Sequence, residues 1–94
     1  MSPANELLVV GGPDVAWRET GGEIVVLDLA GSVYFGLNGM GAELWKTLLA
    51  GSSRAELTAQ LSRRAGRVGP QLQVDVDQFL ADLDEHGLLR RTLV

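Results

Sequence analysis

The chain has 94 residues, of which 46% are hydrophobic and 21% charged, and its formal net charge at pH 7 is −4. This composition argues against wholesale disorder, and the acidic balance disfavours nucleic acid as a partner. With no cysteine and one histidine, the sequence excludes a disulfide scaffold, a zinc–thiolate site and a thiol nucleophile. We expect a single domain over residues 1–94. Because neither a membrane-spanning run nor a signal-peptide pattern is visible, we also expect a cytoplasmic protein with no membrane partner.

The first part of the chain predicts strands. Residues 1–6 are typical of a loose terminus, and residues 7–10 predict a short strand that glycines end. Tight turns at 21–22 and 30–32 then join three strands into an antiparallel meander over residues 15–37. The alternation of apolar and polar residues, together with β-branched residues, predicts these strands at 15–19, 23–29 and 33–37.

Residues 38–87 predict three helices, because apolar residues there recur at helical spacing. Asn38 is a favoured N-cap for the first helix, with its side-chain oxygen accepting an amide of the first turn. Ser53 and Glu56 form a capping-box pattern at the start of the second. The third helix is predicted over residues 74–86. The predicted fold class is therefore α+β, a three-stranded antiparallel β-meander followed by a three-helix bundle, similar to a winged helix.

Two features could carry chemistry, but simpler interpretations are favoured. The glycines between residues 36 and 41 lie between a predicted strand and a predicted helix, where a phosphate-binding loop would lie. Their spacing fits neither the G-x-G-x-x-G pattern nor a loop that ends in Gly-Lys-Ser/Thr. A helix entrance that needs small residues for close packing is therefore favoured. His86 could act as a general base, but a histidine in the last turn of a helix is stabilised there by the helix dipole. We predict no catalytic residue, no cofactor and no metal site.

The strand at 33–37 is predicted to lie at a sheet edge, since the chain leaves it for a helix. Edge strands usually carry Lys, Pro or a bulge that prevents further pairing, whereas this one carries the uncharged residues Tyr34-Phe35-Gly36. A peptide could pair with such an edge by strand addition. Alternatively, residues 7–10 could cover it, or residues 88–94, which form either a closing strand or an apolar tail. The residues alone leave both interpretations open.

A small winged-helix regulator that binds DNA is the alternative interpretation of this element order. The third predicted helix would then bring several carboxylates and no Lys or Arg towards the phosphates, which disfavours this function. The cations that could form a DNA-binding patch lie around the second predicted helix: Arg54, Arg63, Arg64 and Arg67.

Several short segments follow one another in a specific order. They are Gly22–Leu29 (GEIVVLDL), Val33–Phe35 (VYF) with Leu37-Asn38, Gly41–Trp45 (GAELW), and the apolar pattern between Val74 and Leu89. In this order, from about Val15 to Leu89, the chain resembles the PqqD-like family. These proteins are recognition elements for ribosomally made, modified peptides. The resemblance implies a sheet of three strands with three helices, which binds the leader of a precursor peptide as an added strand on the third strand, against the third helix, without catalysing a reaction.

The resemblance further implies the free-standing version used in lasso peptide biosynthesis. There, a leader tyrosine and proline are seated in an apolar pocket. The bound precursor is presented to a separate leader peptidase, a transglutaminase-like cysteine protease, and then to an ATP-dependent lasso cyclase.

Carried onto this sequence, the resemblance places strand pairing at Val33–Gly36. On the third predicted helix we choose the flank that contains Phe79, because this residue offers an apolar wall between two carboxylates; Asp77 and Asp84 lie on the other flank. The candidate peptide-binding residues are Val33, Tyr34, Phe35, Gly36, Asp75, Phe79, Asp82, Leu83 and His86.

Overall fold

The structure is a computed structural model that describes residues 6–29, 31, 33–66 and 69–93, without the side chains of Val33 and Leu93. Its elements in chain order are β1 Glu6–Val10, β2 Val15–Thr20, β3 Glu23–Asp28, β4 Val33–Leu37, α1 Gly39–Ala50, α2 Arg54–Ala65, α3 Pro70–Glu85 and β5 Leu89–Leu93. The predicted α+β class, with a meander followed by three helices, is confirmed. The features predicted at residues 1–5, 30, 32 and 94 lie outside the described residues.

The meander is antiparallel, with the strand order β2-β3-β4. Gly21 and Gly22 have φ values of 59° and 84° and form the two-residue turn between β2 and β3, a conformation that glycine adopts without steric cost. In register, Val26 lies opposite Trp17 on one side and Phe35 on the other. β4 therefore has one side paired with β3 and the other side at the sheet edge.

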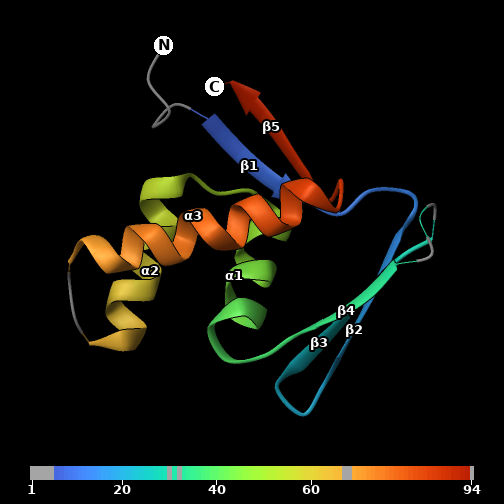
Figure 1. Cartoon of the computed structure of the whole chain (residues 1–94), viewed down its shortest axis with the longest axis horizontal. Coiled ribbons are helices and arrows are strands. Elements are labelled where there is room, and N and C mark those ends of the chain that lie inside the picture. The colour runs from blue at the N-terminus through green and yellow to red at the C-terminus, as the bar shows by residue number, and fades with distance from the viewer. Residues whose placement is uncertain (1–5, 30, 32, 67–68, 94) are drawn as a thin grey trace.

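β1 and β5 form a separate two-stranded antiparallel sheet at the end of α3 (Figure 1). Glu6 lies opposite Leu93, and Val10 lies opposite Leu89. The last residues thus form a strand rather than an apolar tail. Neither β1 nor β5 covers β4, which answers the question that the residues alone left open. Placing Glu6 in a loose terminus was wrong, because its pairing with β5 makes it part of β1.

The helix starts agree with the sequence in part. Ser53 is the N-cap of α2, and its Oγ accepts the Glu56 N–H at 3.1 Å, as predicted. Asn38 is the N-cap of α1, but the predicted side-chain bond is wrong: its side chain caps nothing, and its backbone oxygen accepts the Gly41 N–H at 3.0 Å.

The third helix starts four residues before the predicted position and ends at Glu85, one residue early. Pro70 occupies its first turn, where a missing N–H costs nothing, after Gly69 as N-cap. Leu72 is buried and extends the apolar stripe of the helix by one turn. These two residues carry the signal that the predicted start at Val74 missed.

The hydrophobic core lies between the helices and one face of the meander. We call this face, which carries Ile24 and Val26, the inner face, and the opposite face the outer face. Each buried Leu or Val side chain contributes about 1.5–3 kcal/mol to folding. The other fully buried large side chains are Trp45, Leu48, Leu57, Val76, Leu83 and Leu88.

Candidate functional site

The free backbone groups of β4 follow from the hydrogen-bond pattern of the meander. The residues that flank a two-residue turn exchange both hydrogen bonds, and bonded and non-bonded pairs then alternate. Thr20 and Glu23 flank the turn, so Val26 of β3, three residues beyond Glu23, bonds towards Phe35 of β4. The same alternation points the N–H and C=O groups of Tyr34 and Gly36 away from β3. These groups lie at the free edge of the sheet.

A cleft of about 260 Å³ lies between this edge and α3. Its walls combine apolar side chains with a carboxylate and an imidazole, which come from β4 and from the last turns of α3. The lining residues are Phe35, Gly36, Leu37, Phe79, Asp82, Leu83 and His86.

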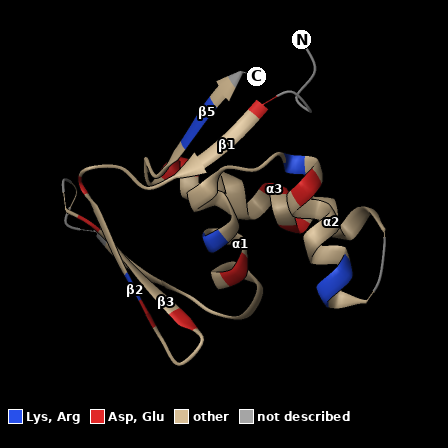
Figure 2. Cartoon of the chain, turned by 180° about the vertical axis from the view of Figure 1, so that it is seen from behind, with Lys and Arg blue, Asp and Glu red and all other residues tan. Residues whose placement is uncertain are grey.

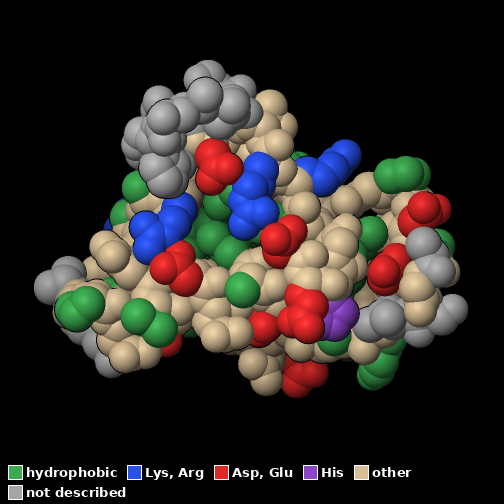
Figure 3. All heavy atoms as spheres, turned by 45° about the horizontal axis from the view of Figure 1, so that its top comes forward, with side chains coloured by type: hydrophobic (Ala, Val, Ile, Leu, Met, Phe, Trp, Pro, Cys, Tyr) green, Lys and Arg blue, Asp and Glu red, His purple; other side chains and the backbone are tan. Residues whose placement is uncertain are grey.

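His86 closes one end of the cleft. Its ring centroid lies 5.1 Å from that of Phe35, and its Nδ1 lies 2.7 Å from the backbone oxygen of Asp82. Figure 3 shows the histidine side chain at the surface beside acidic side chains. His86 has neutral and apolar neighbours on one side and carboxylates on the other, an arrangement suited to the mixed side chains of a peptide.

The two flanks of α3 face different parts of the molecule. On one flank, Arg54 of α2 donates to Asp77, with 2.8 Å between Nη2 and Oδ2, and this hydrogen bond holds the pKa of the Asp77 carboxyl below its usual range. Asp84 on the same flank lies 3.2 Å from Arg91 of β5. The opposite flank carries Phe79 and faces β4.

The cleft brings together six of the nine residues predicted for the site. Two others lie apart from it, because Tyr34 exposes 69% of its surface and Asp75 is exposed and accepts a hydrogen bond from Gln71. The side chain of the ninth, Val33, lies outside the described part of the chain. Leu37 lines the cleft and was missed. The signal for it was available, because alternation along β4 places Leu37 on the same face as Phe35.

Gly39 and Gly41 lie in the first turn of α1, where the sequence predicted a closely packed helix entrance. Gly39 has a φ of 51° at the helix start. A Cβ on Gly41 would lie 3.6 Å from Leu37 Cδ2 and 3.7 Å from Phe79 Cε1. A Cβ at position 41 would therefore make ordinary van der Waals contacts with two residues of the cleft, and the positive φ of Gly39 favours glycine there, but neither observation accounts for Gly36.

Two of the four cations that could have formed a DNA-binding patch are held in ion pairs. Arg54 is bound to Asp77, and Arg64 Nε lies 2.7 Å from Glu43. Arg67 lies outside the described residues. Figure 2 shows the basic residues scattered over several elements rather than gathered on one.

Within the part of the chain that the structure describes, no helix is long and apolar enough to cross a membrane, and no group of three His, Asp or Glu residues could hold a metal ion.

Comparison with known proteins gives one family and two close structural matches. The family "Coenzyme PQQ synthesis protein D (PqqD)" matches residues 23–89. The structure "TbiB1 in Complex with the TbiA(beta) Leader Peptide" is 26% identical, with a TM-score of 0.79 over 87% of this chain and 94% of that one. The structure "Lasso peptide synthetase B1 complexed with the leader peptide" is 25% identical, with a TM-score of 0.71 over 93% of this chain and 99% of that one. A search of curated proteins gave no match.

Proposed function

This chain belongs to the PqqD family, as its sequence predicted, and from that premise we propose that it binds the leader segment of a ribosomally made precursor peptide. The leader is added as a strand to β4 and lies in the cleft against α3. Both structural matches are named as complexes with a leader peptide, which supports this assignment.

The observation that carries the proposal is the unprotected edge of β4. Tyr34 and Gly36 together present two N–H and two C=O groups to a partner strand, and β4 has no charged residue or proline that would prevent pairing. Each backbone hydrogen bond contributes about 0.5–1.5 kcal/mol net. The edge therefore supplies affinity that does not depend on the side chains of the peptide.

The cleft supplies the sequence preference. Alternate side chains of an added strand point to the inner face, where Phe79, Phe35 and Leu37 offer an apolar surface. Asp82 at the wall of the cleft and Asp75 about two turns earlier on α3 attract Lys or Arg of the leader. Exposed ion pairs of this kind contribute about 0.2–1 kcal/mol each. The apolar anchors therefore dominate recognition, and the charges adjust it.

The proposal assigns no chemical step to this chain. It acts in the cytoplasm, where precursor peptides are made, and presents the bound precursor to a separate leader peptidase and then to an ATP-dependent lasso cyclase. The names of the two structural matches, both of leader-peptide complexes and one of a lasso peptide synthetase component, support a role in lasso peptide biosynthesis.

Binding is tested by a fluorescence-anisotropy titration. The probe is a fluorescein-labelled synthetic peptide with the leader sequence of the precursor gene that neighbours the gene of this chain. We expect saturable binding at or below micromolar concentration, lost when the apolar residues of the leader become alanine. Absence of binding at every workable concentration, or equal binding of the alanine peptide, would contradict the proposal.

Presentation is tested separately with the neighbouring peptidase. We expect this chain to raise the rate of leader removal from the full precursor, and the Tyr34→Pro variant to raise it less. A cleavage rate that does not depend on this chain would contradict the presentation step and leave leader binding intact.

A further inference from the structure

Gly36 is a residue that the chain itself does not explain. Nine other glycines have positive φ values, and a Cβ added to Gly41 would be in van der Waals contact with Leu37 and Phe79. Gly36 has a φ outside the left-handed region, and a Cβ built on it meets only the backbone oxygen of Ile24, at 4.0 Å. A glycine inside a strand lowers stability and often marks a place where a ligand approaches closely. The reason for this glycine therefore lies outside the chain.

The missing side chain leaves a gap on the outer face of the sheet. Paired residues in a sheet point to the same face, so Arg18, Val25 and Gly36 form one row across β2, β3 and β4. This is the face opposite Phe35 and the α3 cleft. At Gly36 the row has no side chain, and Val25 behind it is partly exposed.

The surroundings of this gap are apolar. In the next row, Leu27 and Tyr34 expose 36% and 69% of their surfaces. A hollow of about 420 Å³ continues from Val25 and is lined by the outer-face residues Ala16, Arg18, Val25 and Leu27, together with Trp17 between the first two on β2. The outer face thus offers a large side chain an apolar floor and one cation.

We propose that the gap over Gly36 receives an aromatic or other large apolar side chain of the leader peptide, on the face of the sheet opposite the α3 cleft. This inference rests on the proposed function. The leader residue opposite Gly36 points to the outer face, and a large side chain there lies across the glycine onto Val25, as aromatic residues do over glycines in sheets. The Arg18 guanidinium at the far end of the row favours an aromatic ring. The side chains of adjacent leader residues then contact this chain on opposite faces of the sheet, one in the α3 cleft and the next over Gly36.

The test places a side chain in the gap over Gly36 and determines which leader side chain then no longer contributes to affinity. Gly36→Val and Gly36→Ala place a side chain on the outer face, with Thr20→Val as a control on the same face at the far end of the meander. Circular dichroism and thermal melting check folding, which we expect to be retained because the added Cβ has free space. Affinity is measured by anisotropy for the labelled leader and for a set of leaders with single alanine substitutions.

We expect Gly36→Val to weaken binding of the unmodified leader about tenfold, Gly36→Ala to weaken it less, and Thr20→Val to have no effect. For one alanine leader, the one that lacks the outward side chain, wild type and Gly36→Val should bind equally. Equal affinity of wild type and both variants for every leader would overturn the inference while leaving the proposed function standing. If Gly36→Val lowered the affinity for every leader by the same factor, the inference would also be overturned. If the wild type binds no leader, the proposed function fails and this inference fails with it.

Discussion

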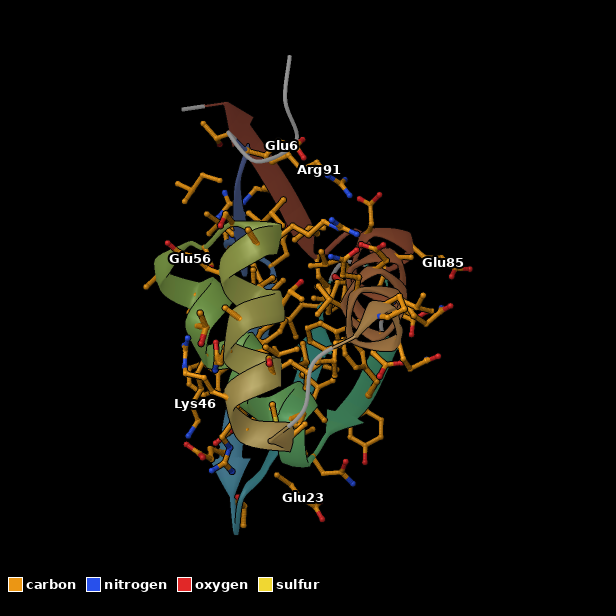
Figure 4. All side chains as sticks on the ribbon, turned by 90° about the vertical axis from the view of Figure 1, so that its left-hand side faces the viewer. Glu6, Glu23, Lys46, Glu56, Glu85 and Arg91 are labelled. Atoms are coloured by element: carbon orange, nitrogen blue, oxygen red, sulfur yellow. The ribbon has the colours of Figure 1, made fainter. Side chains whose placement is uncertain are left out.

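The three-stranded sheet has two edges, and they are built differently. The β2 edge carries the charged residues Arg18 and Glu19, and Glu19 is paired with Lys46 of α1. Figure 4 shows Lys46 on the side of the molecule away from α3. The β4 edge carries no charge and lies beside the α3 cleft. One edge thus has the charges that usually prevent strand pairing, and the other lacks them.

Their free backbone groups differ as well. The alternation that exposes Tyr34 and Gly36 on β4 exposes Val15, Trp17 and Glu19 on β2, and the Val15 N–H already donates to the Gly12 oxygen at 3.2 Å. An incoming strand on β2 would compete with this turn and disturb the Glu19–Lys46 pair. The comparison teaches that edge position alone does not define a peptide site. Uncharged side chains, free backbone groups and an adjacent cleft are needed together.

The largest effect is expected from proline at the β4 edge. Tyr34→Pro removes an N–H that points to the partner strand and places a ring in its path, while the pairs with β3 stay intact. We expect leader affinity to fall at least tenfold, since hydrogen bonds and close approach are lost together. Isothermal titration calorimetry measures this loss, after circular dichroism has confirmed folding.

Two controls sharpen this comparison. Tyr34→Ala removes the same side chain but keeps the N–H, and we expect it to retain most of the affinity. Glu19→Pro makes the equivalent change at the β2 edge and should leave leader binding unchanged. If Glu19→Pro weakened binding as much as Tyr34→Pro, the two edges would not differ in function.

The next effect concerns the cleft wall. Phe79→Ala removes the partly buried ring that faces β4, and we expect leader affinity to fall about tenfold because an apolar anchor loses its contact. Val74→Ala is the matched control on α3, because Val74 is 57% exposed and does not line the cleft. Anisotropy titrations of both variants should separate them. A similar loss in both would mean that α3 contributes general stability rather than a binding wall.

A smaller effect is expected from the carboxylates on the cleft side of α3. Asp75→Asn combined with Asp82→Asn should weaken binding about two- to fivefold and flatten its salt dependence, because the exposed charges are screened by salt. Asp77→Asn changes a carboxylate on the opposite flank, which is bound to Arg54, and should leave binding unaltered. Unchanged affinity and salt dependence in the double variant would remove these carboxylates from the site.

The smallest effect is on stability. The Arg54 hydrogen bond lowers the pKa of Asp77 in the folded state below the usual 3.8. Its stabilisation is therefore present above pH 3.8 and is lost as the pH falls through the folded pKa. Because the two side chains are 39% and 52% exposed, we expect at most about 1 kcal/mol.

The comparison variant for this effect is Asp77→Asn. It should lower the free energy of unfolding near neutral pH by that amount, and the difference from the wild type should shrink in acid. Urea unfolding from about pH 7 to about pH 2.5 measures this difference. A difference that stays constant, or grows as the pH falls, would contradict the assignment.

The sequence predicted those parts of the fold whose signals are local. β-branched runs and paired glycines located the meander, and apolar periodicity located the helices. The pairing of β1 with β5 could not be predicted, because it joins residues from opposite ends of the chain and no local pattern specifies it. The start of α3 was missed because Pro70, a residue suited to the first turn of a helix, was left outside the predicted range 74–86.

Six of the nine predicted residues meet at one cleft, and their role in peptide binding stays a prediction. Spacing along α3 gave two possible flanks, and only the contacts of Asp77 with Arg54 and of Asp84 with Arg91 show which flank faces away from the helix α2 and strand β5. The open outer face at Gly36 also required the register of β3 and β4, which sequence alone does not supply.

The most direct measurement of the central claim is amide hydrogen exchange by NMR, with and without the leader peptide. The account predicts that the amides of Tyr34 and Gly36 become strongly protected on binding, while those of Trp17 and Glu19 at the β2 edge exchange as before. Tight binding without added protection at Tyr34 and Gly36, or protection that appears at the β2 edge instead, would contradict strand addition to β4.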